Sequence, residues 1–402
     1  MVNDRVLHTK DSLPVGVLPG RLDLLRQRIA DHVTSGRTPA LCVVAALDGE
    51  IIFNEALGTR APGDQLVTTD DPYNVMSITK SVVALCIMAL VEDGLLMVTQ
   101  PVGDYLEELR RPGEEDLLVH HLLTHTSGYD DETLMPRWFA KAVSGEKIDV
   151  PEGFDLETHL WLSSSWESTR VQPVGSAMVY ANINYLWLGE IVRRVSGVSL
   201  AHFAHERIFG PLGMTNTAFV LTPEQEERRV KRFGNIPLGP KAGYSTERPE
   251  FANSQLGDRS LKSSAKDLAI LAQMYLNGGT YGGARILSPA SIHQICTSQF
   301  PNLDFRLGSL VFKDPAYGYG MMMDTGTRFR YFNGALQPTG GCSHSGSGGS
   351  NLYFDPKNQL SIICLEIVTE MSPDSEPISG IGRVVSDMLY AALENFQPYG
   401  AP

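Results

Sequence analysis

The 402-residue sequence predicts an α+β fold, with an antiparallel sheet flanked by helices and a mostly helical lobe inserted into it. Helix-like and hairpin-like segments occur near both ends of the chain, while short helix-like pieces alternate with Pro-, Gly- and acid-rich loops between them. We therefore expect a sheet domain made of residues 1–94 and 255–402, and an inserted helical domain of residues 95–254. The apolar periodicity supports the elements, but it does not show that N- and C-terminal strands join in one sheet.

The N-terminal part of the chain predicts a helix, a hairpin and a second helix, in that order. Residues 20–36 have apolar side chains at helical spacing and end at a glycine. Two β-rich runs flank Asp48-Gly49, a dipeptide that favours a two-residue hairpin turn. Residues 81–91 contain one polar residue, Ser81, so a buried helix is expected there, with Gly94 as its C-cap.

The C-terminal part repeats this combination of helix and hairpin. Residues 263–279 begin with a serine N-cap pattern and end at Gly-Gly, as expected for a helix. Residues 350–368 contain two strand-like runs around a polar turn, and an amphipathic helix is expected near 378–396. The polar stretch 222–258 lacks apolar periodicity and is interpreted as irregular surface.

The charge and hydropathy of the chain argue against two kinds of environment, a nucleic-acid partner and a membrane span. Its net charge is −13 and it has no basic run, so the phosphates of a nucleic acid would repel it. No stretch approaches the roughly 18 uninterrupted apolar residues of a membrane span. We expect no nucleic-acid partner and no membrane span, and the oligomeric state stays open.

Cysteine usage and the N-terminus bear on the cellular compartment. The five cysteines form no C-x-x-C pair and lie mostly in apolar or strand-like stretches, which favours reduced core thiols. The first twenty residues contain no apolar run long enough for a signal peptide. These observations predict a cytoplasmic protein, with a processed export form as the alternative.

The first candidate catalytic pair is Ser77 and Lys80, which share a helix face because they are three residues apart. Lysine is rarely buried without a partner, yet an apolar run follows Lys80 directly. Burial favours the neutral amine, which can take the proton of the Ser77 hydroxyl and make it a nucleophile. The alternative is that Ser77 is an N-cap and Lys80 a surface residue of the first helical turn.

The second candidate pair is Tyr180 and Asn182, which precede another apolar helix. A tyrosine near a lysine can relay its proton and protonate a leaving group. The Asn182 amide can donate hydrogen bonds to a substrate carbonyl. The alternative is a buried tyrosine that packs at a helix start.

The third candidate set is a cluster of small residues at 341–349 that leads into a strand. Its glycines would let a substrate approach the backbone closely. The N–H groups of Ser347 and Ser77 can then form an oxyanion hole, with His344 beside it as a hydrogen-bond donor. The alternative is an ordinary glycine-rich turn. The G-x-S-x-G elbow of α/β-hydrolases is not matched, because position 345 is serine.

These three sets, in the order S-x-x-K, Y-x-N and H-S-G, resemble the serine β-lactamase and penicillin-binding-protein superfamily. Within it, the chain most resembles the class C β-lactamase-like group of esterases, D-amino-acid peptidases and D-Ala-D-Ala carboxypeptidases. Similar stretches are HHLLTHTSGYD at 120–130, the helix after Tyr180, IFGPLGMTNT at 208–217 and RSLKSSAKDLAILAQMYLNGG at 259–279. The resemblance runs from about residue 40 to 395 and implies a β-lactamase/transpeptidase-like fold.

The resemblance implies a role for each matching residue and implies no metal or organic cofactor. Ser77 matches the nucleophile, Lys80 its basic partner and Tyr180 the proton-shuttling tyrosine. Ser347 matches the position that gives the second oxyanion N–H. The residues implied to bind substrate are Asn182, His344, Ser345, Gly346 and Ser347.

The third motif departs from the K-T-G of class C β-lactamases, because His344 stands where a lysine would hold a substrate carboxylate. A histidine is neutral or partly charged at pH 7, so carboxylate capture would be weaker. We therefore predict a carboxylesterase-like serine hydrolase that cleaves a small-molecule ester or amide substrate through a Ser77 acyl-enzyme, with acyl transfer as a further ability. The alternatives are a D-amino peptidase, an amidase or a β-lactam-active enzyme, and last a non-catalytic penicillin-binding protein.

Two further interpretations concern the segment before Tyr180. His121 and His125 stand four residues apart, as zinc ligands on a helix can, but no third ligand is evident and we assign no metal site. Four aromatic residues of this segment either line an acyl pocket or pack in the core: Tyr129, Trp138, Trp161 and Trp166.

Overall fold

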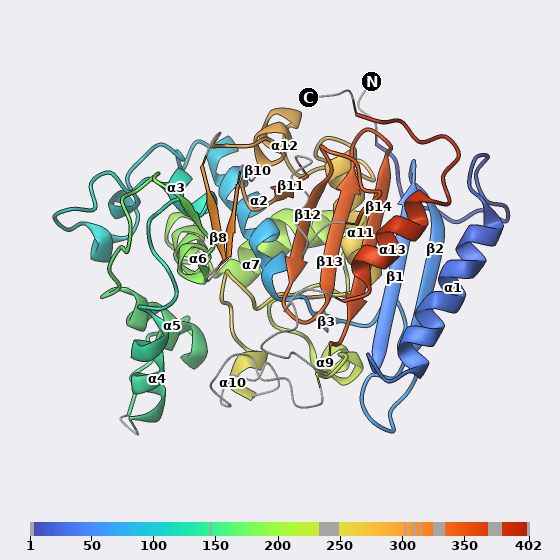
Figure 1. Cartoon of the computed structure of the whole chain (residues 1–402). Coiled ribbons are helices and arrows are strands. Elements are labelled where there is room, and N and C mark those ends of the chain that lie inside the picture. The colour runs from blue at the N-terminus through green and yellow to red at the C-terminus, as the bar shows by residue number, and fades with distance from the viewer. Residues whose placement is uncertain are drawn as a thin grey trace.

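A seven-stranded antiparallel sheet lies at the centre of the computed structural model, in the order β10-β11-β12-β13-β14-β1-β2 (Figure 1). The structure describes residues 4–144, 147–232, 249–300, 303–307, 310–313, 316–324, 334–368 and 380–399. The strands of this sheet are β1 (Ala40–Leu47), β2 (Glu50–Gly58), β10 (Ala316–Tyr317), β11 (Met322–Met323), β12 (Cys342–Gly346), β13 (Ser350–Asp355) and β14 (Leu360–Glu366). The sheet and its flanking helices confirm the predicted α+β class.

The sheet joins the two ends of the chain through strands β1 and β14. These strands pair antiparallel, with Leu41 opposite Glu366 and Leu47 opposite Leu360. The predicted turn between β1 and β2 is confirmed, because Asp48 and Gly49 both have positive φ, 55° and 85°. Two such residues in succession give the backbone twist that a two-residue hairpin requires.

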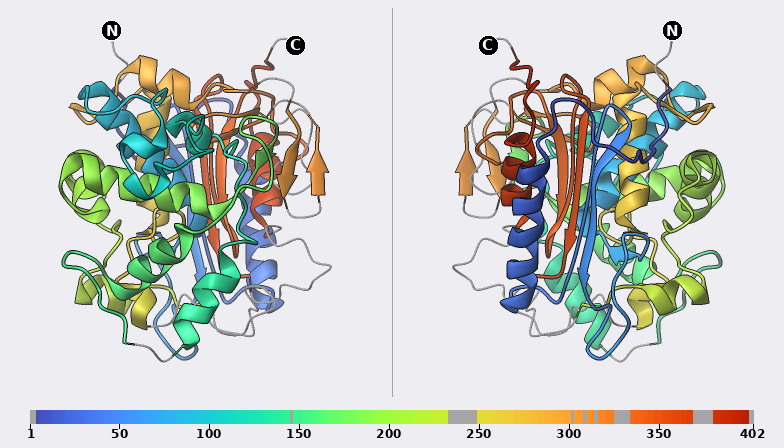
Figure 2. Two further views of the ribbon diagram at one scale, coloured as in Figure 1. Left: turned by 90° about the vertical axis from the view of Figure 1, so that its left-hand side faces the viewer. Right: turned by 90° about the vertical axis from the view of Figure 1, so that its right-hand side faces the viewer.

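Helices α1 (Pro19–Thr34) and α13 (Gly382–Tyr390) cover one face of the sheet, as Figure 2 shows from both sides. Alternate residues of β1, including Leu41 and Val43, pack on this face. The first helix agrees with the expectation for residues 20–36. The described part of the second is shorter than the expected 378–396, because helical structure ends at Tyr390.

Helices α2 (Thr79–Glu92) and α11 (Ala265–Leu276) lie on the opposite face, where Cys42 and Val44 of β1 pack. Every residue of α2 from Thr79 to Leu90 is buried, which confirms the prediction from its apolar sequence. The α11 helix begins as expected, with the Ser264 hydroxyl accepting a hydrogen bond from the Asp267 N–H.

The middle of the chain is mostly helical; most of it lies to the left of the sheet in Figure 1, and its last two helices lie below the sheet. Helix α6 packs against α2 and so links this part to the sheet. Its helices are α3 (Val119–Leu123), α4 (Met135–Val143), α5 (Leu156–Ser165), α6 (Asn182–Ser196), α7 (Leu200–Ala204), α8 (Gly210–Leu212), α9 (Pro223–Arg228) and α10 (Pro249–Ala252). The division at residues 94 and 255 stays a prediction.

Shorter elements complete the described fold. Strand β3 (Tyr73–Asn74) pairs with β5 (Lys262–Ser263), just before the turn that carries Ser77. The others are β4 (Met178–Val179), β6 (Thr280–Tyr281), β7 (Ala284–Arg285), β8 (Phe305–Leu307), β9 (Leu310–Phe312) and helix α12 (Pro289–Ile295).

The stretch 222–258, expected to be irregular surface, is more ordered where the structure describes it. Thr222 and Gln225 form a capping box at the start of α9. Arg232 and Asp258 are buried, although both are charged. The expectation was wrong for these residues because buried polar side chains that bind other residues or the backbone leave no apolar periodicity in the sequence. Residues 233–248 lie outside the described residues.

The remaining predictions from composition concern the state of the cysteines and membrane-spanning helices. All five cysteines are free thiols; four are buried and Cys296 is half-buried, which confirms core-type residues without disulfides. None of the helices in the described part of the chain combines the length and apolar character that crossing a membrane requires.

The burial of α2 gives a stability prediction. Leu85 is 0% exposed, so Leu85→Ala leaves a cavity and should lower the free energy of unfolding by about 2–5 kcal/mol. Leu95, just beyond the helix, is 55% exposed, and Leu95→Ala should change it by less than about 0.5 kcal/mol. Urea unfolding followed by circular dichroism measures both. Equal losses for the two variants would contradict this packing.

Candidate active site

Ser77 lies in a 3-10 turn, η1 (Met76–Ile78), directly before α2. The turn is anchored on one side because the Val75 N–H donates to the Leu261 carbonyl at 3.1 Å. Met76 has a φ of 50°, a conformation that is uncommon for such a side chain and that clusters at functional sites. Ser77 makes no capping hydrogen bond to α2 and is half-buried, so its hydroxyl is not used as an N-cap.

Lys80 is completely buried and its amine contacts Ser77, which excludes the surface alternative. Its Nζ atom lies 3.1 Å from Ser77 Oγ, 2.8 Å from Asn182 Oδ1 and 2.9 Å from the Asp258 carbonyl oxygen. An ammonium group has three N–H donors, and here each has an acceptor. The charged form is therefore fully hydrogen-bonded in spite of its burial.

The Lys80 amine is poised to lose its proton near neutral pH. Burial, which penalises the charged form, lowers the pKa of Lys80 to about 8. The negative charges of Asp258 and Asp131 oppose this shift, whereas the positive charge of Arg259 adds to it. A useful fraction of the neutral amine, which can accept a proton, is therefore present just above neutral pH.

Tyr180 follows strand β4 and lies beside Lys80 and Ser77. The Lys80 Nζ atom is 4.9 Å from the centre of the Tyr180 ring. Burial raises the pKa of Tyr180, although a hydrogen bond with Ser77 acts in the opposite direction. The phenol thus keeps its proton at neutral pH and is available as a donor next to Ser77.

Asn182 is the first residue of α6 and orients Lys80 through its amide oxygen. Its Nδ2 atom donates to Asp131 Oδ2 at 2.8 Å. Asp131 also accepts the backbone N–H groups of Asn182 and Ile183, at 3.0 and 3.1 Å, and so caps α6. The structure therefore gives Asn182 a positioning contact; its predicted contact with substrate stays a prediction.

The third motif forms strand β12, whose end lies against the Ser77 turn. A Cβ atom on Gly346 would come within 2.1 Å of the Val75 carbonyl oxygen and 3.2 Å of Met76 Cβ. Only a glycine allows this approach. Ser347 follows and is half-buried, so the structure brings the two predicted oxyanion residues onto neighbouring segments. Ser345 is buried, and its hydroxyl accepts a 3.4 Å hydrogen bond from Asn351.

His344 is a neutral ring in this structure. Its Nδ1 atom lies 3.0 Å from the Ser345 carbonyl, which can only accept, so Nδ1 must carry the proton and Nε2 must be the acceptor. Burial, assisted by the positive charge of Lys80, lowers its pKa to about 3. The neutral ring agrees with the expectation of a neutral or partly charged His344, but its expected role as a donor beside the oxyanion hole changes, because its donor nitrogen already binds the backbone.

The two histidines weighed as zinc ligands have other partners. His121 Nδ1 accepts the Leu118 N–H at 3.0 Å, and His125 Nδ1 accepts the Ala181 N–H at 3.2 Å. The His125 ring also packs on Tyr180, with ring centres 4.4 Å apart. Across the described residues, no three His, Cys, Asp or Glu side chains gather as metal ligands would.

The aromatic residues of the middle segment act as packing residues. Tyr129, Trp138 and Trp161 are buried, and Trp166 is half-buried. Trp138 and Trp161 stack with ring centres 4.7 Å apart. The acyl-pocket alternative gains no support from this arrangement.

Several site residues carry no signal that sequence analysis can use. Asp258 contributes a backbone carbonyl to Lys80, and its carboxylate pairs with Arg259 at 2.5 Å. Arg232 donates to the carbonyl oxygens of Asn74 and Ser347. All three lie in or next to the stretch that was interpreted as surface. Asp131 had a usable signal, since an acidic residue is a common partner for a helix N-terminus.

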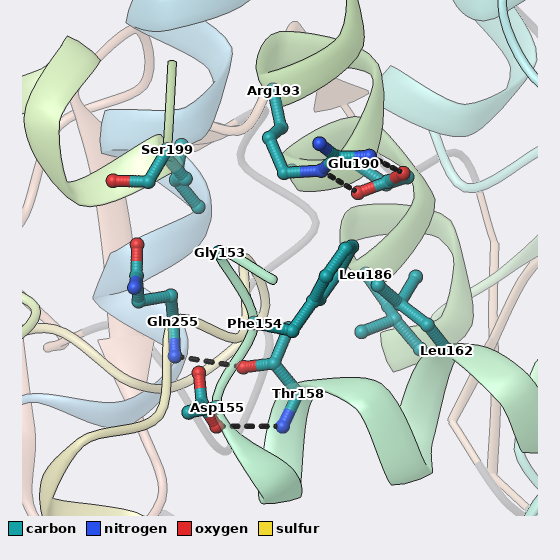
Figure 3. Close-up of a pocket in the computed structure, with 12 residues that line it drawn as sticks. Gly153, Phe154, Asp155, Thr158, Leu162, Leu186, Glu190, Arg193, Ser199 and Gln255 are labelled. Carbon is teal, nitrogen blue, oxygen red and sulfur yellow. Dashed lines mark hydrogen bonds and ion pairs between the residues drawn. The ribbon is translucent and has the colours of Figure 1, made fainter. Parts of the chain in front are cut away.

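A separate small cavity lies within the helical part of the molecule (Figure 3). It is lined by Phe154, Leu162 and Leu186, with the Arg193–Glu190 ion pair at one side. None of the predicted site residues borders it. We assign it to the packing of α5, α6 and α7.

The close contact at Gly346 gives a prediction for the site. Gly346→Ala should push β12 away from the Ser77 turn and lower the free energy of unfolding by about 1–3 kcal/mol. Gly20→Ala is the control, because a Cβ there meets no atom within 4 Å; its stability should be unchanged or slightly higher. Thermal unfolding of both variants is the measurement. A Gly346→Ala variant as stable as the control would contradict the contact.

The chain is similar to several known proteins. The chain is 26% identical over 418 residues to a protein of Escherichia coli O157:H7 that is named provisionally as a D-alanyl-D-alanine carboxypeptidase, covering 93% of this chain and 91% of the other. A penicillin-binding-protein homologue from Caulobacter crescentus superposes with a TM-score of 0.74, at 21% identity and over 94% of this chain and 99% of the other. A family VIII carboxylesterase gives 0.72, at 20% identity and over 94% and 98%.

At these identities the two structures establish a shared fold, that of the serine β-lactamases and penicillin-binding proteins. The family model described as Beta-lactamase matches residues 25–370, which include all the predicted site residues. The chain therefore belongs to the Beta-lactamase family.

Proposed function

We propose that this protein is a serine hydrolase that cleaves carboxylic esters through an acyl-enzyme on Ser77. The observation that carries the proposal is the contact between a buried amine of lowered pKa and a half-buried serine hydroxyl. A serine is a weak nucleophile until a base takes its proton, and Lys80 is such a base at hydrogen-bond distance. Membership of the Beta-lactamase family supports the same class of chemistry.

The acylation step uses the three acceptors around Lys80. The neutral amine keeps two N–H donors, which can stay on the Asn182 Oδ1 atom and the Asp258 carbonyl, while its lone pair faces Ser77. Lys80 takes the hydroxyl proton as Ser77 Oγ attacks the ester carbonyl. The bond to the leaving alcohol then breaks, the alcohol oxygen takes a proton from Tyr180, and the Lys80 ammonium returns its proton to Tyr180.

The negative charge that develops on the carbonyl oxygen needs fixed donors. We assign this part to the N–H groups of Ser77 and Ser347, and one such donor is typically worth roughly 3–4 kcal/mol in the transition state. The close approach of Gly346 to the Val75 carbonyl supports the assignment, because it brings the two segments next to each other.

Hydrolysis of the acyl-enzyme repeats these steps with water as the nucleophile. Lys80 takes a proton from water as the water oxygen attacks the acyl carbon, and the Ser77 oxygen then leaves with a proton that the Lys80 ammonium returns to it. An alcohol in place of water would give acyl transfer, which is the further ability we assign to the site.

The neutral His344 favours an ester over a substrate with a free carboxylate. A ring with a pKa of about 3 carries no positive charge at pH 7, so it cannot hold a carboxylate by charge. This supports an esterase over a β-lactam-active enzyme. A D-amino peptidase is the second candidate, supported by the likeness to the Escherichia coli protein over nearly the full chain.

The nucleophile is tested by p-nitrophenyl butyrate hydrolysis. The wild type should cleave this ester, and Ser77→Ala should lose nearly all turnover, because no other group forms the acyl-enzyme. Ser81→Ala is the matched control, since this buried hydroxyl only donates to the Ile78 carbonyl, and it should keep most activity. Activity retained in Ser77→Ala would contradict the mechanism, whereas an inactive wild type that cleaves D-amino peptides would favour the second candidate.

The pKa of Lys80 predicts the pH dependence. The base is the neutral amine, so kcat/KM should rise as the pH passes through about 8 and then level off. The Asp258 charge raises this pKa, so Asp258→Asn should move the rise to lower pH. Asp355→Asn is the control, because this buried carboxylate lies in the β13–β14 hairpin and should leave the profile in place. A profile that Asp258→Asn does not move would argue against Lys80 as the base.

A further inference from the structure

Arg232 links the two segments that carry the predicted oxyanion N–H groups. Its side chain is 8% exposed, although it carries a guanidinium group. One nitrogen, Nη2, donates to the Asn74 carbonyl at 3.2 Å and to the Ser347 carbonyl at 2.8 Å. Asn74 lies three residues before Ser77, and Ser347 lies just after β12. A single charged group therefore binds both backbone segments that border the site.

The turn after β12 is built around this guanidinium. Gly348 has a φ of 88°, and a Cβ atom on it would come within 1.9 Å of Arg232 Nη1. The Gly349 N–H donates to the Gly346 carbonyl at 3.3 Å and closes the turn. The Gly346 carbonyl belongs to the same peptide unit as the Ser347 N–H, so this hydrogen bond fixes the direction of that N–H. Arg232 holds the next peptide unit.

The backbone around Arg232 places its side chain with little freedom. The Val230 N–H donates to the Pro72 carbonyl, and the Lys231 N–H donates to the Arg60 carbonyl, both at 2.8 Å. The segment thus runs beside the chain that leads into β3. These two backbone hydrogen bonds explain how Arg232, which is far from the catalytic motifs in the sequence, reaches the Ser77 turn.

We propose that Arg232 is a positioning residue, which sets the spacing between the Ser77 and Ser347 N–H groups by binding the Asn74 and Ser347 carbonyls together. The proposal rests on the proposed function, because it concerns the oxyanion hole of that reaction. Donors to a developing oxyanion lose most of their effect when they are misplaced by about 1 Å, so the loss of this bridge lowers kcat. Ground-state binding of the substrate does not depend on it, and KM changes little.

The test compares Arg232→Gln and Arg232→Lys with Arg229→Gln as the matched control. Arg229 is 5% exposed and pairs with Glu226 in the same segment. The measurements are kcat and KM for p-nitrophenyl butyrate and the inhibition constant of a phenylboronic acid, which forms a tetrahedral adduct on serine. Arg232→Gln should lower kcat by about 10- to 100-fold and weaken the boronic acid in parallel. Arg232→Lys keeps a charged donor with a shorter reach, so its loss should be smaller but measurable.

A purely structural role would give a different result. A folded Arg232→Gln variant with wild-type kcat and wild-type boronic acid inhibition would overturn the proposal, and so would a rise in KM alone. If Arg232→Gln does not fold, the same comparison is made with Arg232→Lys, for which unchanged kcat and inhibition would overturn it. Arg229→Gln should match the wild type in both measurements.

Labelling of Ser77 by a fluorophosphonate separates this proposal from the proposed function. The serine oxygen displaces fluoride from phosphorus, its proton passes to Lys80, and peptide mass spectrometry detects the adduct. If the wild type is labelled but does not cleave the ester, the ester assignment fails, and a slower labelling rate in Arg232→Gln still supports the positioning role. Equal labelling rates would overturn the positioning role alone. A wild type that is not labelled would overturn both.

Discussion

The Lys80 amine is the point at which three separate parts of the chain meet. A buried cation is costly unless each of its donors is satisfied, and here the acceptors come from the Ser77 turn, the start of α6 and the Asp258 backbone. Any shift of one segment would leave a buried N–H group without a partner. This requirement holds α2, α6 and the segment before β5 in one arrangement, and it places Ser77 beside its base.

The charges around Lys80 leave one group that titrates near neutral pH. Asp258 and Asp131 favour the ammonium form, while burial and Arg259 oppose it, so the pKa of Lys80 falls to about 8. Burial raises the pKa of Tyr180 and lowers that of His344, so both aromatic neighbours stay neutral under the same conditions. One amine can therefore exchange a proton with Ser77 while its neighbours keep fixed protonation states, which is the arrangement that general acid–base chemistry needs.

The side of the site that β12 and the turn after it form depends on close backbone contacts. Gly346 has no Cβ and can approach the Val75 carbonyl, and Gly348 leaves room for the Arg232 guanidinium. The end of β12 therefore lies against the Ser77 turn, and Arg232 joins the two segments through hydrogen bonds to the Asn74 and Ser347 carbonyls. Such rigid support is what an oxyanion hole requires, since its donors must be in place before the charge develops.

The sequence by itself determined the elements that depend on near neighbours in the chain. The Asp48-Gly49 turn, the buried helix α2 and the N-cap at Ser264 each follow from residues within a few positions of one another. The pairing of Ser77 with Lys80 was predictable for the same reason, since three residues of helix bring them together. The family resemblance added the fold, and it added expected partners for this pair only where motifs matched residue by residue.

Only the tertiary structure decided how these elements combine. It joined β1 to β14 in one sheet, supplied Asp258 as the third acceptor of Lys80, and turned the donor nitrogen of His344 toward its own backbone. The Asp258 contact uses a carbonyl oxygen, which every residue carries, so no residue type marks it in the sequence. Arg232 was hidden for a related reason, because its partners are also backbone carbonyls. Contacts of this kind exist only after the chain has brought distant segments together.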